Sequence, residues 1–333
     1  MTMIETVRGP VPEESLGRVL AHEHIFVLSP EIQANYPEEW GEEETRVAQA
    51  ADRLNELKAS GIDTIIDPTA IGLGRYLPRI SDVAARTELN IVVATGLYTF
   101  NELPHYYRGR RPPRDGSAVD ILTTHFVQDI AEGVSATTTP DGGKVKAGVI
   151  KCATDQPGLT PDVERTLRAC AQAHRQTGCP ITTHTHARSE RGLDQQRVFT
   201  EEGVDLSRVV IGHCGDTDDL DYLSKLLEQG SYLGMDRFGI DGYLTTDQRV
   251  GVIAELCRRG FESQLVLSHD ASCYIDWIAG ELPLGPLPNW HYLHISNDVI
   301  PALLAAGVSS EQVDVMLVDN PRRFLASAGQ GGY

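Results

Sequence analysis

Short apolar runs rich in β-branched residues recur along the chain and are separated by turn residues. Runs of this length and composition are typical of strands that are buried on both faces of a parallel sheet. We expect eight such strands, at Val19–Phe26, Asp63–Pro68, Ile91–Leu97, Ala147–Cys152, Pro180–His184, Val209–Gly212, Tyr232–Met235 and Leu265–His269.

The segments between several of these runs have the apolar spacing of amphipathic helices. We expect helices at Arg46–Ala59, Asp162–Gln176, Asp219–Gln229 and Arg249–Arg259. Glycine, which readily adopts the left-handed conformation of a helix end, follows each of them, at positions 61, 178, 230 and 260. Thr160 followed by Pro161 predicts a helix start, because proline suits the first helical turn. Ser309 and Gln312 have the spacing of a capping box and predict another start.

Strands that alternate with helices indicate a parallel sheet whose connections are right-handed crossovers. Eight strand–helix units close naturally into a barrel, so we expect an α/β protein with the (β/α)8 TIM-barrel fold. The chain has 333 residues and 41% hydrophobic content, which suits one complete barrel, and we expect a single domain over residues 1–333. Arg108–Ala118 and Gly133–Lys146 are rich in Pro, Gly, Thr and Asp and predict surface loops.

Composition narrows the classes of partner. The formal net charge is −18 and no stripe of Lys or Arg offsets it, so we expect no binding to nucleic acid or to anionic membranes. The apolar runs are far shorter than the roughly 20 residues of a membrane span, and the N-terminal segment has no secretory signal, which together predict a cytoplasmic protein. The six cysteines form no C-x-x-C pair and indicate free, mostly buried thiols. From the negative charge of the chain we expect a ligand that is a small neutral molecule or one with an uncharged head group.

Residues that can bind metals or transfer protons gather where the predicted strands end. The C-terminal ends of the strands form the active site of a (β/α)8 barrel, so this position is itself informative. Five of the strands end in such residues, which are His22 and His24, Lys151, His184 and His186, His213, and His269 and Asp270. The sequence thus predicts a cluster of imidazole, amine and carboxylate groups at one mouth of the barrel.

His22 and His24 have the i, i+2 spacing that puts two side chains on one face of a strand, where both imidazoles can bind one metal ion. Hydrogen-bonded core histidines show the same spacing, so the pair alone does not decide between the two interpretations. His184, His213 and Asp270 add two imidazoles and a hard carboxylate, which suit a metal ion that also holds a water.

The neighbouring polar residues have other expected places. His186 shares the strand face of His184 but lies further into the loop, where it either joins the site or supports a ligand. Glu23 and His269 are expected to point away from the site, because each is adjacent to a residue that points into it. We assign the other histidines to packing, capping or the surface; they are His105, His125, His174, His291 and His294.

Lys151 ends a strand whose preceding residues are apolar. An amine at such a place is destabilised by burial unless it is paired or modified. Its side chain therefore either reaches the polar rim of the barrel or has a role inside the site. An ammonium group cannot bind a metal ion, so a direct role would require conversion of the amine to a carbamate.

Six short motifs stand in order along the chain: HEH at 22–24, GVIKCA at 148–153, TTHTHA at 182–187, IGHCGD at 211–216, GMDRFG at 234–239 and LSHDA at 267–271. In these motifs the chain resembles the phosphotriesterase family of the amidohydrolase superfamily, and within it the phosphotriesterase-like lactonases. The resemblance extends from Gly9 to Phe324. It implies the barrel fold and a centre of two divalent metal ions, with Zn as the first choice and Fe, Co or Mn as alternatives.

The resemblance also implies which residues bind the metal ions. The ligands would be His22, His24 and Asp270 for the more buried ion, and His184 and His213 for the more exposed ion. Lys151, as N6-carboxylysine, would bridge the two ions. Asp270 would in addition orient a bridging hydroxide and accept its proton.

Two further residues match positions that border the substrate in lactonases of this family. Tyr98 follows the third predicted strand, where its phenol would hydrogen-bond the lactone or only pack at the rim. Arg237 lies in the loop after the seventh strand. It would contact the substrate, or form an ion pair with Asp236 or with another acid of the loops.

The segment after the eighth predicted strand is too apolar for a long solvent-exposed loop. Its apolar residues are Tyr274, Ile275, Trp277, Ile278, Leu282, Leu284 and Trp290. They would cover an acyl chain of the substrate or form a contact between subunits, because exposed apolar patches often mark association. The resemblance implies a homodimer, so the two interpretations can share residues.

From the site and the resemblance together we expect a hydrolase of ester bonds. It would hydrolyse N-acyl-homoserine lactones and related lactones, and the hydrolysis of such lactones is called quorum quenching. It would also hydrolyse organophosphate triesters, more slowly. One site can support both reactions, because the tetrahedral intermediate of lactone opening resembles a phosphotriester in charge placement. The alternatives are a phosphotriesterase proper and a catalytically silent binding protein on the same fold.

Overall fold

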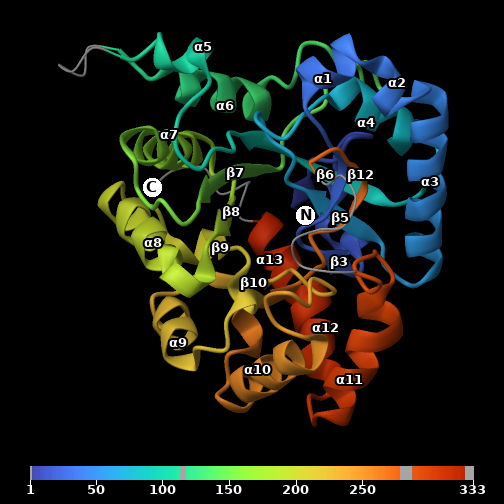
Figure 1. Cartoon of the computed structure of the whole chain (residues 1–333), viewed down its shortest axis with the longest axis vertical. Coiled ribbons are helices and arrows are strands. Elements are labelled where there is room, and N and C mark those ends of the chain that lie inside the picture. Colours follow the sequence, from blue (N-terminus) through green and yellow to red (C-terminus); the bar gives the residue numbers. More distant parts are fainter. Residues whose placement is uncertain (1, 113–117, 278–286, 327–333) are drawn as a thin grey trace.

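The computed structural model describes residues 2–112, 118–277 and 287–326. Its central feature is a parallel sheet of eight strands. In sheet order the strands are β3 (Val19–Leu20), β5 (Thr64–Asp67), β6 (Asn90–Gly96), β7 (Val149–Thr154), β8 (Ile181–Thr185), β9 (Val209–Ile211), β10 (Tyr232–Met235) and β11 (Leu265–Leu267). Figure 1 shows these strands in the middle of the molecule, with the order in the sheet following the order in the chain.

The sheet closes where its first and last strands meet. The backbone N–H of Ala21 donates to the carbonyl oxygen of Leu267 at 3.1 Å. Just beyond, β4 (His24–Val27) pairs in parallel with β12 (Ser272–Ile275). The closed arrangement confirms the (β/α)8 barrel expected from the sequence.

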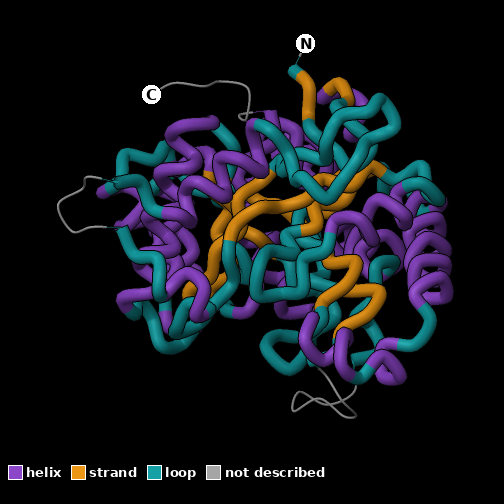
Figure 2. The backbone as a smooth tube through the Cα atoms, turned by 90° about the horizontal axis from the view of Figure 1, so that it is seen from above, coloured by secondary structure: helices purple, strands orange, loops and turns teal. Residues whose placement is uncertain are grey.

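Helices surround the strands, as Figure 2 shows in the view from above. They are α1 (Pro30–Asn35), α2 (Pro37–Trp40), α3 (Glu43–Ala59), α4 (Leu77–Ala84), α5 (His105–Arg108), α6 (Ile121–Ala131), α7 (Pro161–Thr177), α8 (Arg191–Glu201), α9 (Leu220–Glu228), α10 (Thr246–Arg258), α11 (Ile300–Ala305), α12 (Ser310–Asp314) and α13 (Asn320–Ala326). A short hairpin of β1 (Met3–Ile4) and β2 (Val11–Pro12) precedes the barrel. In the described part of the chain, no helix has the length and apolar character needed to cross a membrane.

Two apolar clusters pack on the opposite faces of the strands. One joins side chains from most of the barrel strands with the last helix; it contains Val19, Ile66, Val92, Ala94, Val149, Val210, Val266, Phe324 and Leu325. The larger cluster joins the alternate strand residues to the surrounding helices. Each fully buried aliphatic side chain contributes about 1.5–3 kcal/mol to folding. The same alternation turns Lys151, two residues after Val149, to the face of that residue.

The expected helix signals are present. Thr160 caps α7 by accepting a hydrogen bond from the N–H of Val163, and Pro161 is its first residue. Ser309 and Gln312 form the capping box of α12. Gly178 adopts the left-handed conformation, with φ of 73°, directly after α7. These local rules therefore set both ends of α7 and the start of α12 as predicted. By contrast, α3 and α10 begin at Glu43 and Thr246, three residues before the expected starts at Arg46 and Arg249.

The first predicted strand, Val19–Phe26, is wrong in one respect, because it is divided into β3 and β4 by a break at residues 21–23. The buried carboxylate of Glu23 lies in the break and accepts the backbone N–H groups of His269 and Ala271, both at 2.9 Å. A side chain thus takes donors that a regular ladder would use. His22 lies in the break rather than within a continuous strand.

Candidate metal centre

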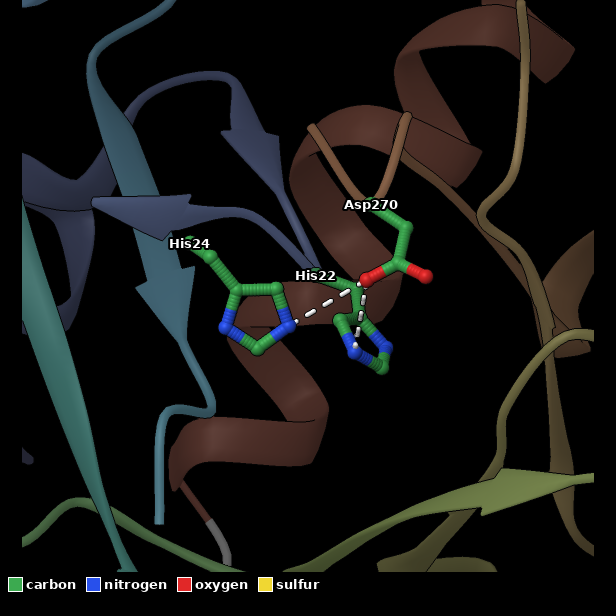
Figure 3. A group of neighbouring side chains, drawn as sticks. All are labelled: His22, His24 and Asp270. Atoms are coloured by element: carbon green, nitrogen blue, oxygen red, sulfur yellow. Dashed lines mark ion pairs between the residues drawn. The ribbon is translucent and has the colours of Figure 1, made fainter. Parts of the chain in front are cut away.

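His22, His24 and Asp270 converge where the first and last strands close the barrel. Oδ1 of Asp270 lies 3.5 Å from Nε2 of His22 and 3.2 Å from Nε2 of His24. Figure 3 shows both rings turned toward this carboxylate. The side chains of His22 and His24 are 1% and 8% exposed, and that of Asp270 is 14% exposed, so the carboxylate is the part closest to solvent.

His184 and His213 complete a group of four imidazoles. The ring centroid of His213 lies 4.8 Å from that of His22 and 4.5 Å from that of His184. Nε2 of His213 lies 3.8 Å from Oδ2 of Asp270, the oxygen not used by the first pair. The structure therefore brings together the four histidines and the aspartate that the sequence singled out.

Lys151 lies inside this group and not at the rim. Its side chain is 1% exposed, and Nζ lies 3.0 Å from Nε2 of His22 and 3.3 Å from the carbonyl oxygen of Thr183. Burial lowers the pKa of the Lys151 amine to about 8. The alternative in which this lysine reaches the polar rim is therefore wrong, and a role within the site is favoured.

Asp236, directly after β10, orients two of the histidines. Its Oδ2 accepts Nδ1–H of His22 at 3.0 Å, and its Oδ1 accepts Nδ1–H of His213 at 2.9 Å. Because Nδ1 carries the proton in both rings, each Nε2 presents a lone pair toward Asp270. A Cβ at Gly234 would lie 2.3 Å from Oδ2 of Asp236, so the smallest residue at this position makes room for the carboxylate.

The other two histidines are also oriented by hydrogen bonds. Nδ1 of His24 donates to Oγ1 of Thr69 at 2.7 Å, and this hydroxyl donates to Asp67 at 2.5 Å. Nε2 of His184 donates to Oδ2 of Asp155 at 2.6 Å. When each ring is neutral, its lone pair is therefore on Nε2 in His24 and on Nδ1 in His184.

The charged neighbours and burial shift the pKa values of these rings in opposite directions. Burial disfavours the charged form of His24, but the carboxylates of Asp270 and Asp67 outweigh it and raise its pKa to about 9. For His184, burial dominates over the bond to Asp155 and lowers the pKa to about 4. Burial keeps the pKa of His213 well below its usual value. The last two rings are therefore neutral, as a metal ligand must be.

Two of the candidate ligands have unusual backbone conformations. His213 has φ of 59° and Asp270 has φ of 56°, and Glu190 is the only other non-glycine residue with positive φ among those described. Such a conformation costs on the order of 1–3 kcal/mol, and residues that adopt it cluster at functional sites. The backbone N–H of His213 donates to Oδ1 of Asp236 at 2.7 Å, a bond that helps to hold the conformation.

A cavity of about 410 Å³ opens above the cluster. Its base contains the six candidate ligands, and its walls are largely apolar; they include Val27, Leu73, Phe100, Ile240, Tyr243, Ile275, Trp277, Leu287 and Trp290. Such a combination of apolar walls and a few convergent polar groups is typical of a small-molecule site.

Tyr98 and Arg237 both line this cavity. The hydroxyl of Tyr98 lies 3.3 Å from Nδ1 of His184, and burial raises the pKa of the phenol, so it stays protonated and can donate. Nε of Arg237 donates to Oδ2 of Asp270 and Nη1 donates to Oδ2 of Asp216, both at 2.9 Å. The ion-pair partners of Arg237 are thus Asp216 and Asp270, and the alternative pairing with Asp236 is wrong.

The structure also places the other polar residues for which the sequence made a prediction. Glu23 and His269 point away from the site and bond to each other, with Nδ1 of His269 at 2.6 Å from Oε1 of Glu23. His186 lines the cavity, but its Nδ1 is bonded to Oγ of Ser189 at 2.7 Å. His294 is buried and bonded to Asp298 and Thr246, as expected for a packing residue.

Part of the apolar segment that follows the eighth barrel strand, β11, lines the cavity. Ile275, Trp277 and Trp290 line it, and Nε1 of Trp290 donates to the carbonyl oxygen of Asp270 at 3.2 Å. Tyr274 instead packs edge-to-face on Trp40, with the ring centroids 4.9 Å apart. Three further residues named from the sequence lie outside the described residues; they are Ile278, Leu282 and Leu284.

The groups that orient the histidines were not identified from the sequence. They are Asp236, Asp155 and Thr69, and all three come just after a barrel strand, namely β10, β7 and β5. Their position in the chain is the signal that marks them, because acids and hydroxyls at the strand ends of a barrel lie beside the ligands that these ends carry.

The donor set fits divalent cations. Three imidazoles, those of His22, His24 and His213, turn Nε2 to the carboxylate of Asp270. Together with His184 and the buried amine of Lys151, they offer nitrogen and oxygen ligands of the kind that Zn and similar ions prefer. A second group, in which Asp236 meets His22 and His213, is close enough to bind an ion. There, however, the contacts are hydrogen bonds through Nδ1, so this group supports the ligands. A (β/α)8 barrel with this site at its mouth has the architecture of a metal-dependent hydrolase of the amidohydrolase type.

Comparison with known proteins specifies the family. The sequence profile of the Phosphotriesterase family matches residues 2–325, and the chain belongs to this family of metal-dependent hydrolases within the amidohydrolase superfamily. It is 58% identical over 333 residues to a "Phosphotriesterase homology protein" of Mycobacterium tuberculosis (strain CDC 1551 / Oshkosh), with 100% of each chain covered. It is 36% identical over 324 residues to an "Aryldialkylphosphatase" of Saccharolobus solfataricus, covering 96% of this chain and 98% of that protein.

A solved structure agrees with these relationships. It is described as the structure of the phosphotriesterase from Mycobacterium tuberculosis and superimposes with a TM-score of 0.93 at 58% sequence identity. The match covers 99% of this chain and 100% of the other. The barrel described above is therefore the fold of the family.

Proposed function

We propose that this protein opens lactones, with N-acyl-homoserine lactones as the preferred class, and hydrolyses organophosphate triesters more slowly. One observation carries the proposal. The ligand cluster forms the base of an apolar cavity of about 410 Å³, and two hydrogen-bond donors, Tyr98 and Arg237, line the same cavity. The polar base and the apolar wall of the cavity suit an acyl lactone, whose ester group would lie next to the cluster and whose acyl chain would lie against the aromatic side chains.

The chemistry of the ester bond requires an electrophile and a nucleophile. Two bound divalent ions would polarise the substrate carbonyl and lower the pKa of a water toward neutrality. We propose the same ligands as the resemblance implied: His22, His24 and Asp270 for one ion, and His184 and His213 for the other. Lys151 would join the two sites as a carbamate, which forms when its neutral amine adds to carbon dioxide and releases a proton.

Asp270 is the group of this chain best placed to handle the proton of the attacking water. Its oxygens face three imidazoles, and Arg237 donates to Oδ2, so its pKa is held well below the usual value despite burial. A strongly ionised carboxylate orients the water and takes up its proton only as the oxygen attacks.

Tyr98 and Arg237 supply the donors on the substrate side. The phenol of Tyr98 has its proton available, and the guanidinium of Arg237 is charged at every ordinary pH. Hydrogen bonds from such donors favour the negative charge that develops on the oxygen atoms of the ester during attack. The ring oxygen leaves after it is protonated, and the opened acyl-homoserine carries a new carboxylate.

The main rival is a phosphotriesterase proper, because a relative that is 36% identical carries the name aryldialkylphosphatase. The cavity does not separate the two, since both substrates place an ester centre at the cluster. A second rival is a silent binding protein. The family and the complete set of ligand positions favour an enzyme.

A substrate profile tests the proposal. Lactones of graded acyl length and one p-nitrophenyl phosphotriester are assayed with protein whose metal content is known from elemental analysis. We expect higher kcat/KM for the acyl-homoserine lactones than for the phosphotriester. The reverse order would establish the phosphotriesterase, and fewer than about one metal equivalent after gentle purification would favour the binding protein.

We also propose that the protein is a homodimer. Ile32 on α1 is 41% exposed, Tyr36 directly after α1 is 51% exposed, and Tyr76 directly before α4 is 53% exposed. Large apolar side chains exposed at the surface can mark the place where two copies of a chain associate. Light scattering on the purified protein tests this directly, and a monomer mass at micromolar concentration would contradict it.

A further inference from the structure

Arg249, on the outer helix α10, is one of the largest side chains that is completely buried. Its guanidinium spans two different partners. Nη2 donates to Oδ1 of Asp216 at 2.8 Å, and the carbonyl oxygens of Ile240 and Leu244 accept from the same guanidinium. A buried arginine is thus tied both to a carboxylate and to the backbone of the loop that precedes its own helix.

Asp216 connects Arg249 to the candidate metal centre. Its other oxygen, Oδ2, accepts from Nη1 of Arg237 at 2.9 Å, and Nε of Arg237 donates to Asp270, also at 2.9 Å. Positive and negative groups therefore alternate without interruption from α10 to a candidate ligand. Neither Asp216 nor Arg249 is a candidate ligand; Asp216 lines the cavity and binds Arg237 and Arg249 through its two different oxygens.

The loop held by Arg249 also forms part of the cavity wall. Ile240 and Tyr243 line the cavity, and the carbonyl oxygens bound by Arg249 lie at positions 240 and 244, on either side of Tyr243. The guanidinium of Arg237 lies 5.5 Å from the centre of the Tyr243 ring. A shift of this loop would move the apolar wall and the donor together.

We propose that Arg249, acting through Asp216, is a positioning residue that sets Arg237 and the 240–244 loop for substrate binding. The inference rests on the proposed function, since it takes the cavity as the substrate site. Arginine suits this task because its planar fork holds several acceptors in fixed directions, which a lysine ammonium cannot do. Arg249 touches neither the cavity nor the candidate ligands, so its effect on substrate would be indirect.

The test compares Arg249→Lys with a matched control, Arg165→Lys. Arg165 on α7 has the same kind of contacts, because it binds the carboxylate of Asp120 and the carbonyl oxygens of Tyr107 and Arg110. It does not line the cavity. Its side chain is 11% exposed, against 0% for Arg249. A general effect of replacing an arginine that holds a loop would appear in both variants.

The readouts are KM and kcat for a short-chain and a long-chain acyl-homoserine lactone, and the Kd of the ring-opened product. The product Kd is measured by tryptophan fluorescence, because Trp277 and Trp290 line the cavity. We expect Arg249→Lys to raise KM and Kd about tenfold or more, since small displacements of a positioning group have large effects. We expect kcat per bound metal to change less, and Arg165→Lys to match the wild type.

Unchanged KM and Kd in folded Arg249→Lys would overturn the inference, as would equal increases in both variants. If Arg249→Lys does not fold, Asp216→Asn replaces it, because the amide keeps the shape but not the charge that holds Arg237. A wild-type KM in that variant would also overturn the inference. If the wild type opens no lactone, the proposed function fails, and the same comparison is made on the p-nitrophenyl phosphotriester.

Discussion

Nζ of Lys151 lies 3.0 Å from Nε2 of His22, in the interior of the barrel. The contact places a buried amine against the lone pair that His22 would offer to a metal ion. As an ammonium, Lys151 would compete with a cation for that lone pair; as a carbamate, it would become a ligand beside it. On the proposed function, the state of this one side chain would decide how many ions the site can hold.

Replacing Lys151 by Ala should leave the protein with one metal ion in place of two. The carbamate would be lost, whereas the histidines and Asp270 would keep their places, because Asp236 and Thr69 still orient the rings. Elemental analysis gives the stoichiometry. A short carboxylic acid such as propionate should partly restore the second ion and the activity. Two tightly bound ions in Lys151→Ala would contradict a bridging role.

The stability of the metal-free protein should depend on pH through Lys151. Burial lowers the pKa of its amine from 10.5 to about 8, so between these values the unfolded chain binds more protons than the folded one. The free energy of unfolding should therefore rise across this window, by up to about 1.4 kcal/mol as the pH increases by one. Lys151→Met should lack this increase. Thermal unfolding at pH 7.5 and 9.5, in chelator and CO2-free buffer, measures the difference between the two proteins, and parallel behaviour would exclude the effect.

Asp236 should matter more for metal affinity than Asp155 does. The carboxylate of Asp236 accepts from two rings, and an asparagine there would present an N–H to one of them and force it into the wrong tautomer. Asp236→Asn should weaken metal binding about 10–100-fold, as usual for groups that orient ligands. Asp155→Asn should affect one ion only, since Asp155 contacts His184 alone among the candidate ligands. Chelator competition gives both affinities; equal losses would argue against these assignments.

Trp277 should control the preference for acyl-chain length. It lines the cavity yet is 45% exposed, which places it at the outer part of the wall. Trp277→Ala should raise KM for a long-chain lactone about tenfold, because contact with several methylene groups worth about 0.8 kcal/mol each is reduced. KM for a short-chain lactone should stay close to that of the wild type. A similar increase for both chain lengths would mean that the acyl chain lies elsewhere.

The sequence predicted the barrel well because its signals are local and repeated. Strand runs, helix caps such as Thr160 and the strand-end histidines each depend on near neighbours in the chain. The break that contains His22 was not predictable in this way, since it arises from Glu23 reaching the backbone of residues 269 and 271.

The support of the site also depends on contacts between distant strands. Asp236 meets His22 across a separation of 214 residues, and no spacing rule connects the two. The left-handed backbone conformation of His213 and Asp270 was not predictable from the sequence either, because neither residue type requires it. Lys151 shows the limit most clearly: the sequence left two places open for its side chain, and burial in the structure decided between them.

The most direct test of a metal-dependent lactonase is the turnover of Asp270→Asn at a metal content equal to that of the wild type. Asp270 is the carboxylate on which the imidazoles and Arg237 converge, and it is the proposed acceptor of the proton from water. We predict that kcat for an N-acyl-homoserine lactone falls at least about 100-fold. A variant that keeps both metal ions and opens the lactone at the wild-type rate would contradict the account.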